Sequence, residues 1–252
     1  MQKFYADLLQ PSRREIWFDV LIWVPHLTLA CIAVWWEFWP LAILCWFFFF
    51  LTGLRQAHEA FHKTMGLPRR VNDLLLFILS PLMLSCLHAT RWIHLQHHRF
   101  CLREGDVEGR AAQQSWLQAI LLGPRYPVQS HMEAWRSGHP GTRRWITGEA
   151  LGIVLFYLAG CYLLPRLIVP HLVAMIAAQW LVSFFAVWMV HHDCPEPQNP
   201  SRTIRAYWKR LLTYHMFYHH EHHAYPSVPT RNLPELARRM DALGLSTRRQ
   251  AF

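Results

Sequence analysis

The stretch LAILCWFFFFLTGLRQAHEAFH, residues 41–62, decides the fold class of this chain. Its first part, residues 41–54, is apolar enough to lie in a bilayer, and no helix breaker separates it from the polar part that follows. We therefore expect one long helix that leaves the membrane at Arg55 and carries His58 and His62 just beyond it. These two histidines are spaced i and i+4, so their imidazoles lie on one face of the helix.

Other apolar runs accompany this stretch. Of the 252 residues, 53% are hydrophobic and 16% are charged, against roughly 25% charged residues in a soluble domain. A hydrocarbon core about 30 Å thick is crossed by roughly 20 helical residues, and tilted or partly apolar helices also cross it. We expect a single all-α domain over residues 1–252 that is integral to the membrane, with transmembrane helices at about 16–36, 41–54, 150–164 and 171–190.

A fifth apolar segment, about 71–87, is expected not to cross. It begins with Asn72 and Asp73 and is interrupted by Pro81, so its uninterrupted part is shorter than a comfortable span. If it crossed, His58 and His62 would lie on the opposite side of the membrane from the histidines that follow it. We therefore expect a re-entrant or interfacial helix.

Charge and cysteine patterns narrow the class further. The formal net charge is +9, and the basic residues gather between the apolar runs, which predicts that both termini and the histidines lie in the cytoplasm. No nucleic-acid-binding motif accompanies the charge, so no nucleic-acid partner is expected. No removable signal peptide is expected at the N-terminus. The six cysteines are scattered without a C-x-x-C, which predicts neither a disulfide framework nor a thiolate metal site.

Two further histidine boxes follow, and each is expected to present its histidines on one face of a helix. One is His94-x-x-His97-His98, and the other is His219-x-x-His222-His223 within TYHMFYHHEHHAYP, residues 213–226. Together the three boxes hold eight imidazoles, whereas tetrahedral zinc takes four ligands. The set suits two octahedral ions that keep a position open for oxygen, and iron fits best. His192, at the end of the last apolar run, could supply a ninth imidazole.

Three alternatives stay open at this point. The last box alone could be an adventitious metal patch. HEAFH also fits H-E-x-x-H, the motif of zinc proteases, in which Glu59 would be the general base, but this alternative leaves both H-x-x-H-H boxes without a role. A metal transporter would carry ligands inside its spans, whereas these apolar runs are nearly free of ionisable groups.

The segment NPSRTIRAYWKRLLTYHMFYHHEHHAYPSVPTRNLP, residues 199–234, resembles the last histidine box and its flanks in small bacterial fatty acid desaturases. Its E-H-H-x-x-P-x-V-P-x-x-x-L-P part is similar to carotenoid ketolases of the same superfamily. The chain is therefore identified, over about residues 16–236, as resembling the membrane-bound fatty acid desaturase and hydroxylase superfamily. This resemblance implies four transmembrane helices and a cytosolic helical cap that holds a histidine-rich di-iron site.

The resemblance also implies roles for individual residues. No catalytic residue is expected beyond the metal ligands, and His192 is assigned as the ninth ligand in preference to its neighbour His191. His215 is a possible ligand or a neighbour of the metals. The acidic stretch after the second box, REGDVEGR, departs from a clear D-P-D, so its Asp106 and Glu108 are expected beside the ligands. Glu59 and Glu221 are expected to orient neighbouring imidazoles.

The expected activity follows from this resemblance. It is the O2-dependent, di-iron oxidation of an unactivated C–H bond in a lipid chain, with fatty acyl desaturation as first choice and carotenoid ketolation or hydroxylation as the alternative. The expected partners are a lipid or acyl substrate and a separate electron donor of the ferredoxin type. The expected location is the bacterial inner membrane.

Overall fold

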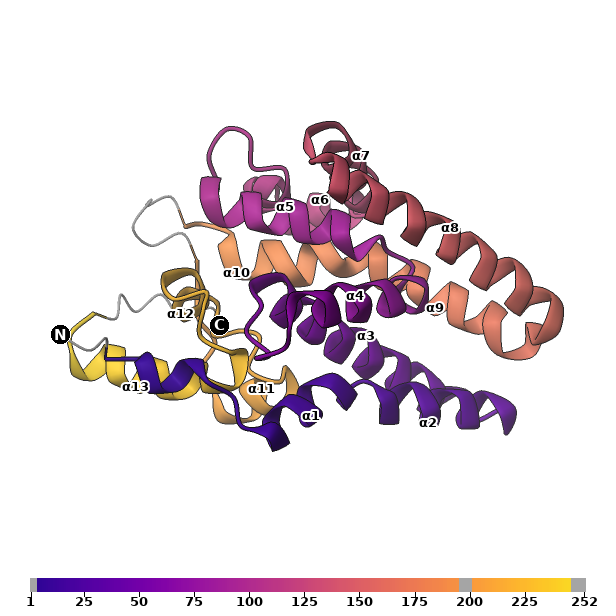
Figure 1. Ribbon diagram of the computed structural model, residues 1–252, viewed down its shortest axis with the longest axis horizontal. Helices are drawn as coiled ribbons and strands as arrows, with labels where there is room; N and C mark the ends of the chain where they lie inside the picture. Colours follow the sequence, from indigo (N-terminus) through magenta and orange to yellow (C-terminus); the bar gives the residue numbers. More distant parts are fainter. Residues whose placement is uncertain (1–3, 195–200, 246–252) are drawn as a thin grey trace.

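A computed structural model describes residues 4–194 and 201–245 of the chain, and Figure 1 shows how its helices are arranged. Long helices lie side by side through most of the molecule, and short helices from the C-terminal part gather at one end of them. Over the described ranges the chain contains helices and turns and no β-strand. The expected all-α class is confirmed.

The first two long helical segments form a hairpin. The short helix η1 (Ala6–Leu9) precedes α1 (Arg13–Leu21), which begins with a capping box between Ser12 and Glu15. After a break before Pro25, α2 (Val24–Trp35) continues the first candidate span, Arg13–Trp35. Then α3 (Trp39–His62) runs without interruption from the apolar stretch into HEAFH, as expected, and ends at Lys63 with a positive φ of 58°. The two box histidines therefore lie on the last turns of a rigid helix.

The next apolar segment turns back sharply. Helix α4 (Arg69–Met83) ends at Leu84, whose φ is 52°, and α5 (Leu87–Phe100) leaves at an angle of 109°. A buried polar cluster holds this bend against a later helix: the Glu149 carboxylate accepts from the Ser80 hydroxyl at 2.7 Å and from the His88 backbone N–H at 3.1 Å. The bend brings α5 back beside the end of α3, so the second box lies next to the first.

The second pair of long helices follows a polar connector. It contains η2 (Glu108–Gln113), α6 (Trp116–Leu121) and α7 (Arg125–Ser137). Helix α8 (Pro140–Leu163) begins about ten residues before the apolar run, and α9 (Pro165–Ser183) begins at Pro165, ahead of the span expected at about 171–190. Proline is tolerated at the start of a helix because the first N–H groups have no partner there. A π-helical turn, η3 (Phe184–Trp188), then leads into α10 (Met189–His191).

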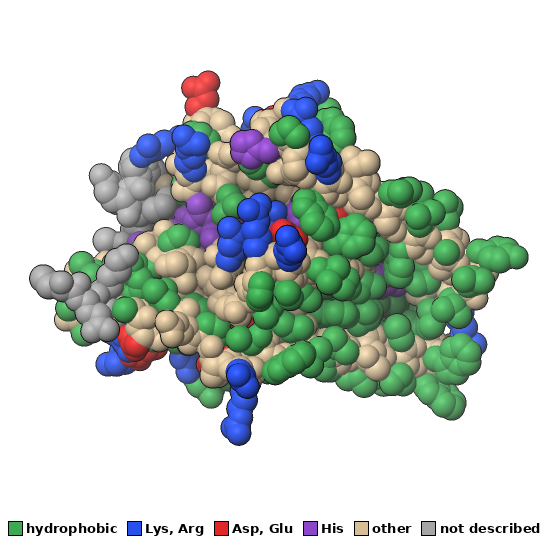
Figure 2. All heavy atoms as spheres, viewed as in Figure 1, with side chains coloured by type: hydrophobic (Ala, Val, Ile, Leu, Met, Phe, Trp, Pro, Cys, Tyr) green, Lys and Arg blue, Asp and Glu red, His purple; other side chains and the backbone are tan. Residues whose placement is uncertain are grey.

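Within the described ranges, four helical segments are long and apolar enough to cross a membrane: Arg13–Trp35, Trp39–His62, Pro140–Leu163 and Pro165–His191. The turns that join each pair meet, since the Arg166 guanidinium donates to the Glu37 carboxylate at 2.7 Å and to the Trp35 carbonyl at 2.9 Å. On the face shown in Figure 2, most apolar side chains lie toward this end of the molecule. Most of the charged side chains and histidines lie toward the other end.

The C-terminal part forms a small cap of its own. It comprises α11 (Tyr207–Leu212), α12 (His219–Ala224), η4 (Thr230–Asn232) and α13 (Leu233–Ala242). Leu8 of η1 packs with Leu233, Leu236 and Met240 of α13 in a separate apolar core. Buried ion pairs fasten this cap to the long helices: the Asp19 carboxylate contacts Arg55 at 2.6 Å and also contacts Arg231. The last box is thereby held above the end of α3.

Candidate metal centre

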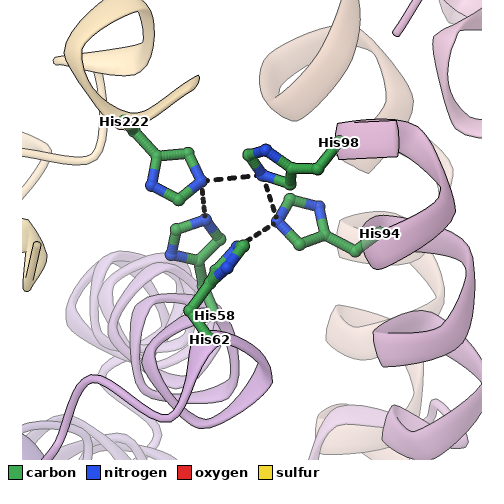
Figure 3. Close-up of side chains that lie close together, drawn as sticks. All are labelled: His58, His62, His94, His98 and His222. Carbon is green, nitrogen blue, oxygen red and sulfur yellow. Dashed lines mark hydrogen bonds between the residues drawn. The ribbon is translucent and has the colours of Figure 1, made fainter. Parts of the chain in front are cut away.

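Five imidazoles from three helices converge in one pocket, named here the five-imidazole pocket (Figure 3). The Nε2 atom of His58 lies 3.0 Å from that of His222, and the Nε2 atom of His62 lies 2.9 Å from that of His94. The Nε2 atom of His98 lies 3.2 Å from that of His94 and 2.9 Å from that of His222. All five rings therefore turn the same nitrogen toward one small volume.

Four further imidazoles form an adjoining group, named here the four-imidazole pocket. Its members are His97 of α5, His191 of α10, and His219 and His223 of α12. The Nε2 atom of His191 lies 3.0 Å from that of His97 and 2.8 Å from that of His219, and the Nε2 atoms of His219 and His223 are 3.1 Å apart. The rings of His98 and His223 stack with their centroids 4.4 Å apart, so the two pockets share a wall.

Helical spacing explains which histidine enters which pocket. Residues four apart lie on one face, so His94 and His98 reach the five-imidazole pocket while His219 and His223 reach the four-imidazole pocket. The remaining member of each box, His97 or His222, points into the other pocket. The boxes were expected to present their histidines on a single face, but the structure divides each of the last two boxes between two pockets.

Two carboxylates after the second box contact its imidazoles. The Nδ1 atom of His97 lies 2.8 Å from the Asp106 carboxylate, and that of His94 lies 3.0 Å from the Glu108 carboxylate. A neutral imidazole that donates its Nδ1 proton to a carboxylate keeps the lone pair on Nε2. The contacts agree with the position expected for Asp106 and Glu108, although the sequence lacks a D-P-D.

The other two acidic residues have different partners from those expected. Glu59 accepts from the Thr230 backbone N–H at 2.7 Å and from the Thr64 hydroxyl, and Glu221 accepts from Thr203 at 2.8 Å and from Arg205 at 3.0 Å. These hydrogen-bond partners are threonines and an arginine and not the metal-pocket imidazoles. Both fasten the cap, and Glu59 is not available as the base of an H-E-x-x-H protease.

Two adjacent histidines at the end of the last span lie differently with respect to the pockets. His191, not the expected His192, lies in the four-imidazole pocket, whereas the His192 ring stacks on Trp188 and its Nδ1 atom donates to the Ala112 carbonyl at 3.0 Å. The π-helical turn η3 holds an extra residue and so shifts the phase of the helix before α10. Sequence periodicity does not reveal this shift.

His215 lies in neither pocket. Its φ is 65°, its backbone N–H donates to the Arg210 carbonyl at 2.8 Å, and its ring lies near Tyr218. The expectation that His215 is a possible ligand or neighbour of the metals is therefore not supported by its position. Cys101, which the sequence argument set aside, does lie beside the four-imidazole pocket. The signal that could have found it is its i+4 spacing from His97.

The donor set fits two metal ions. Nδ1 of His94 donates to Glu108 in the five-imidazole pocket, and Nδ1 of His97 donates to Asp106 in the other pocket, so Nε2 of each ring faces other imidazole nitrogens about 3 Å away. Facing imidazole nitrogens at this distance share a hydrogen bond when one ring carries a proton on Nε2, and a cation that accepts both lone pairs can take the place of that proton. Burial, and then neighbouring imidazoles, lower the pKa of His219, His222 and His223 well below the usual value of histidine. Neutral imidazole is the form that binds metal.

The sequence of this chain is similar to that of a known protein family. A family model described as fatty acid desaturase matches residues 33–247, which include all nine imidazoles of the two pockets. Two proteins of Haematococcus lacustris, named Beta-carotene 4-ketolase 3 and Beta-carotene ketolase, are each 26% identical to this chain over 216 residues. The alignments cover 78% of this chain and 61% of each relative, so the chain spans about three fifths of the length of these relatives.

Proposed function

This chain belongs to the fatty acid desaturase family, whose members are oxidoreductases, and on that premise we propose that it is a di-iron enzyme that oxidises an unactivated C–H bond of a lipid chain with O2. Its four long apolar helices are those of an integral membrane protein. A lipid substrate is therefore available from the bilayer itself.

The observation that carries the proposal is the convergence of nine Nε2 atoms in two adjoining pockets. In the five-imidazole pocket they come from α3, α5 and α12, and in the four-imidazole pocket from α5, α10 and α12. Imidazole suits iron, and paired ions with open positions suit the use of oxygen. The nine proposed ligands are His58, His62, His94, His97, His98, His191, His219, His222 and His223.

Bound irons would supply the redox chemistry that activates O2, and the chain's own residues hold and orient them. Asp106 and Glu108 keep the Nδ1 protons of His97 and His94 in place, so these rings cannot rotate away from the pockets. Glu59 of α3 accepts from the Thr230 backbone and so holds the cap against α3, and Glu221 braces the last box within the cap through Thr203 and Arg205. This pre-organisation keeps the ligands at fixed positions while substrate enters and leaves.

The reaction needs electrons from outside the chain. Desaturation takes two hydrogens from adjacent carbons of the chain and two electrons and two protons from a donor, and it reduces one O2 to two waters. We propose that the donor is a separate acidic protein of the ferredoxin type. Lys63 and Arg99 directly follow the proposed ligands His62 and His98, and both are exposed. Figure 2 shows Lys and Arg side chains beside histidines on this face.

The substrate has two candidates. Fatty acyl desaturation is the first, because it is the activity named in the description of the matching family. Carotenoid ketolation is the second, and the likeness to two β-carotene ketolases favours it. Both substrates are long apolar chains that lie in a bilayer.

Expression in a bacterial host that makes both acyl lipids and β-carotene tests the proposal. Mass spectrometry of the extracted lipids is expected to show acyl chains that have lost two hydrogens, and these should be absent with the His222→Ala variant. A carbonyl in place of a CH2 group of β-carotene, with unchanged acyl chains, would instead establish the second candidate. No oxidised lipid of either kind from an iron-loaded, reduced enzyme would contradict the proposal.

The orientation is part of the same proposal. Arg13, Arg14, Arg55 and Arg69 lie at the same end of the long helices as the pockets, which by the positive-inside rule is the cytoplasmic side of a bacterial inner membrane. Labelling of a cysteine introduced at the exposed Arg103 is expected from the cytoplasmic side. Labelling from the periplasm in intact cells would reverse the orientation.

A further inference from the structure

The two pockets differ in their number of imidazoles, and the sulfur atom of Cys101 lies beside the one that has four. We propose that the Cys101 thiolate is the fifth protein ligand of the metal ion in the four-imidazole pocket. This inference rests on the proposed metal centre and adds a ligand to it. It departs from the expectation, drawn from the scattered cysteines, that the chain has no thiolate metal site.

The position of the sulfur supports a role as ligand. The Sγ atom of Cys101 lies 4.0 Å from Nε2 of His97, which is the atom of that ring proposed to bind metal. It also lies 3.8 Å from Nδ1 of His223, which is the ring nitrogen not proposed to bind metal. A metal–nitrogen bond is about 2.1 Å long and a metal–sulfur bond about 2.3 Å, so two such ligands of one ion lie about 3.1 Å apart at a right angle and about 4.4 Å apart when opposite. The distance to His97 falls between these limits.

The four-imidazole pocket has room for one more protein ligand than the five-imidazole pocket has. The neighbouring pocket offers five imidazoles, and the four-imidazole pocket offers four. An octahedral ion with five protein ligands keeps one position for oxygen, whereas an ion with four ligands leaves two positions. A thiolate from Cys101 would bring both ions to the same number of protein ligands.

The loop that carries Cys101 is held by the residue that orients His97. Asp106 accepts from the backbone N–H of Leu102 at 2.7 Å and of Gly109 at 2.9 Å, while its Oδ2 atom also contacts Nδ1 of His97. The Cys101 backbone N–H donates to the His97 carbonyl at 2.7 Å. These hydrogen bonds fix the backbone of Cys101 relative to His97, so the sulfur stays close to the His97 imidazole.

A thiolate ligand determines which metal ions the site favours. Cysteine binds metal as the thiolate, so binding displaces its proton to water. A mixed nitrogen and sulfur set favours a softer divalent ion such as Fe²⁺ or Co²⁺ over Mg²⁺ or Ca²⁺. The simplest different role for the sulfur is to accept a hydrogen bond from Nδ1 of His223, which would leave no metal–sulfur bond.

X-ray absorption at the metal edge separates these roles in the wild-type protein. Purified protein in detergent, loaded with Co²⁺, is expected to bind two ions per chain and to show sulfur about 2.3 Å from the metal, together with a thiolate-to-cobalt absorption band. Cys101→Ser is expected to lose both signals. The matched control is Cys161→Ser, at the far end of α8, which should keep them.

Two outcomes overturn the inference and are distinguishable. Two bound Co²⁺ ions with only nitrogen and oxygen neighbours would eliminate the sulfur ligand while leaving the proposed metal centre intact. Failure of the wild-type protein to bind any Co²⁺ or Fe²⁺ would overturn the proposed function itself, and the sulfur ligand with it. Because the decisive spectrum is that of the wild-type protein, a variant that fails to fold does not obscure the result.

Discussion

His97 and His98 are neighbours in the sequence but belong to different pockets. The Nε2 atom of His97 lies 3.0 Å from that of His191, and the Nε2 atom of His98 lies 2.9 Å from that of His222. Consecutive side chains on a helix differ in direction by about 100°, so an adjacent pair at a shared wall serves both sides of it. This divergence lets one short box contribute an imidazole to each of the two pockets.

The first prediction concerns the adjacent pair at the end of α10. His191→Ala is expected to reduce bound iron from about two ions per chain to about one, because His191 faces the four-imidazole pocket. His192→Ala is the matched control and should keep about two, since its ring stacks on Trp188 outside the pockets. Metal analysis of the purified variants measures this. The reverse pattern would restore His192 as the ligand.

The second prediction concerns the carboxylate that orients His97. Asp106→Asn is expected to weaken metal binding by about 10- to 100-fold, as is typical when the partner of a ligating histidine is lost. The exposed Glu104, in the same loop, provides the control Glu104→Gln, which should bind metal as the wild type does. Competition with a chelator of known affinity measures both. Equal affinities in the two variants would contradict an orienting role for Asp106.

The third prediction separates Glu59 from a catalytic base. Glu59→Gln is expected to lower the free energy of unfolding by about 2 kcal/mol, because its carboxylate accepts from Thr64 and from the Thr230 backbone. Metal content and lipid oxidation should persist in the folded protein. Thermal unfolding in detergent and metal analysis test this together. A variant of wild-type stability that had lost its activity would point to a chemical role for Glu59.

The fourth prediction compares a buried ion pair with an exposed one. Asp19→Asn is expected to destabilise the protein by about 3–5 kcal/mol, because it leaves buried Arg55 without its anionic partner. Glu37→Gln removes the exposed pair with Arg166 and should cost about 1 kcal/mol or less. Chemical or thermal unfolding of both variants in the same detergent measures the difference. Similar losses would show that the Asp19 contacts do not anchor the cap.

Much of the fold could be predicted because its signals are local. The apolar stretch that runs into HEAFH predicts the long helix α3, and the structure has that helix from Trp39 to His62. Where local signals were weaker, the ends differed: α8 begins at Pro140, well before the apolar run that predicted it. An apolar run predicts the part of a helix that lies in lipid, whereas capping signals predict where the helix begins. The two positions differ because a helix can extend beyond the lipid.

The sequence by itself determined that this is a helical membrane protein with three histidine boxes, because composition and i, i+4 spacing are properties of short segments. The tertiary structure alone decided which imidazoles share a pocket, since that depends on the 109° bend between α4 and α5 and on the cap over α3. It also decided between His191 and His192, because the π-helical turn changes the phase of the last span. It brought Cys101 beside His223, more than a hundred residues away, which no local pattern contains.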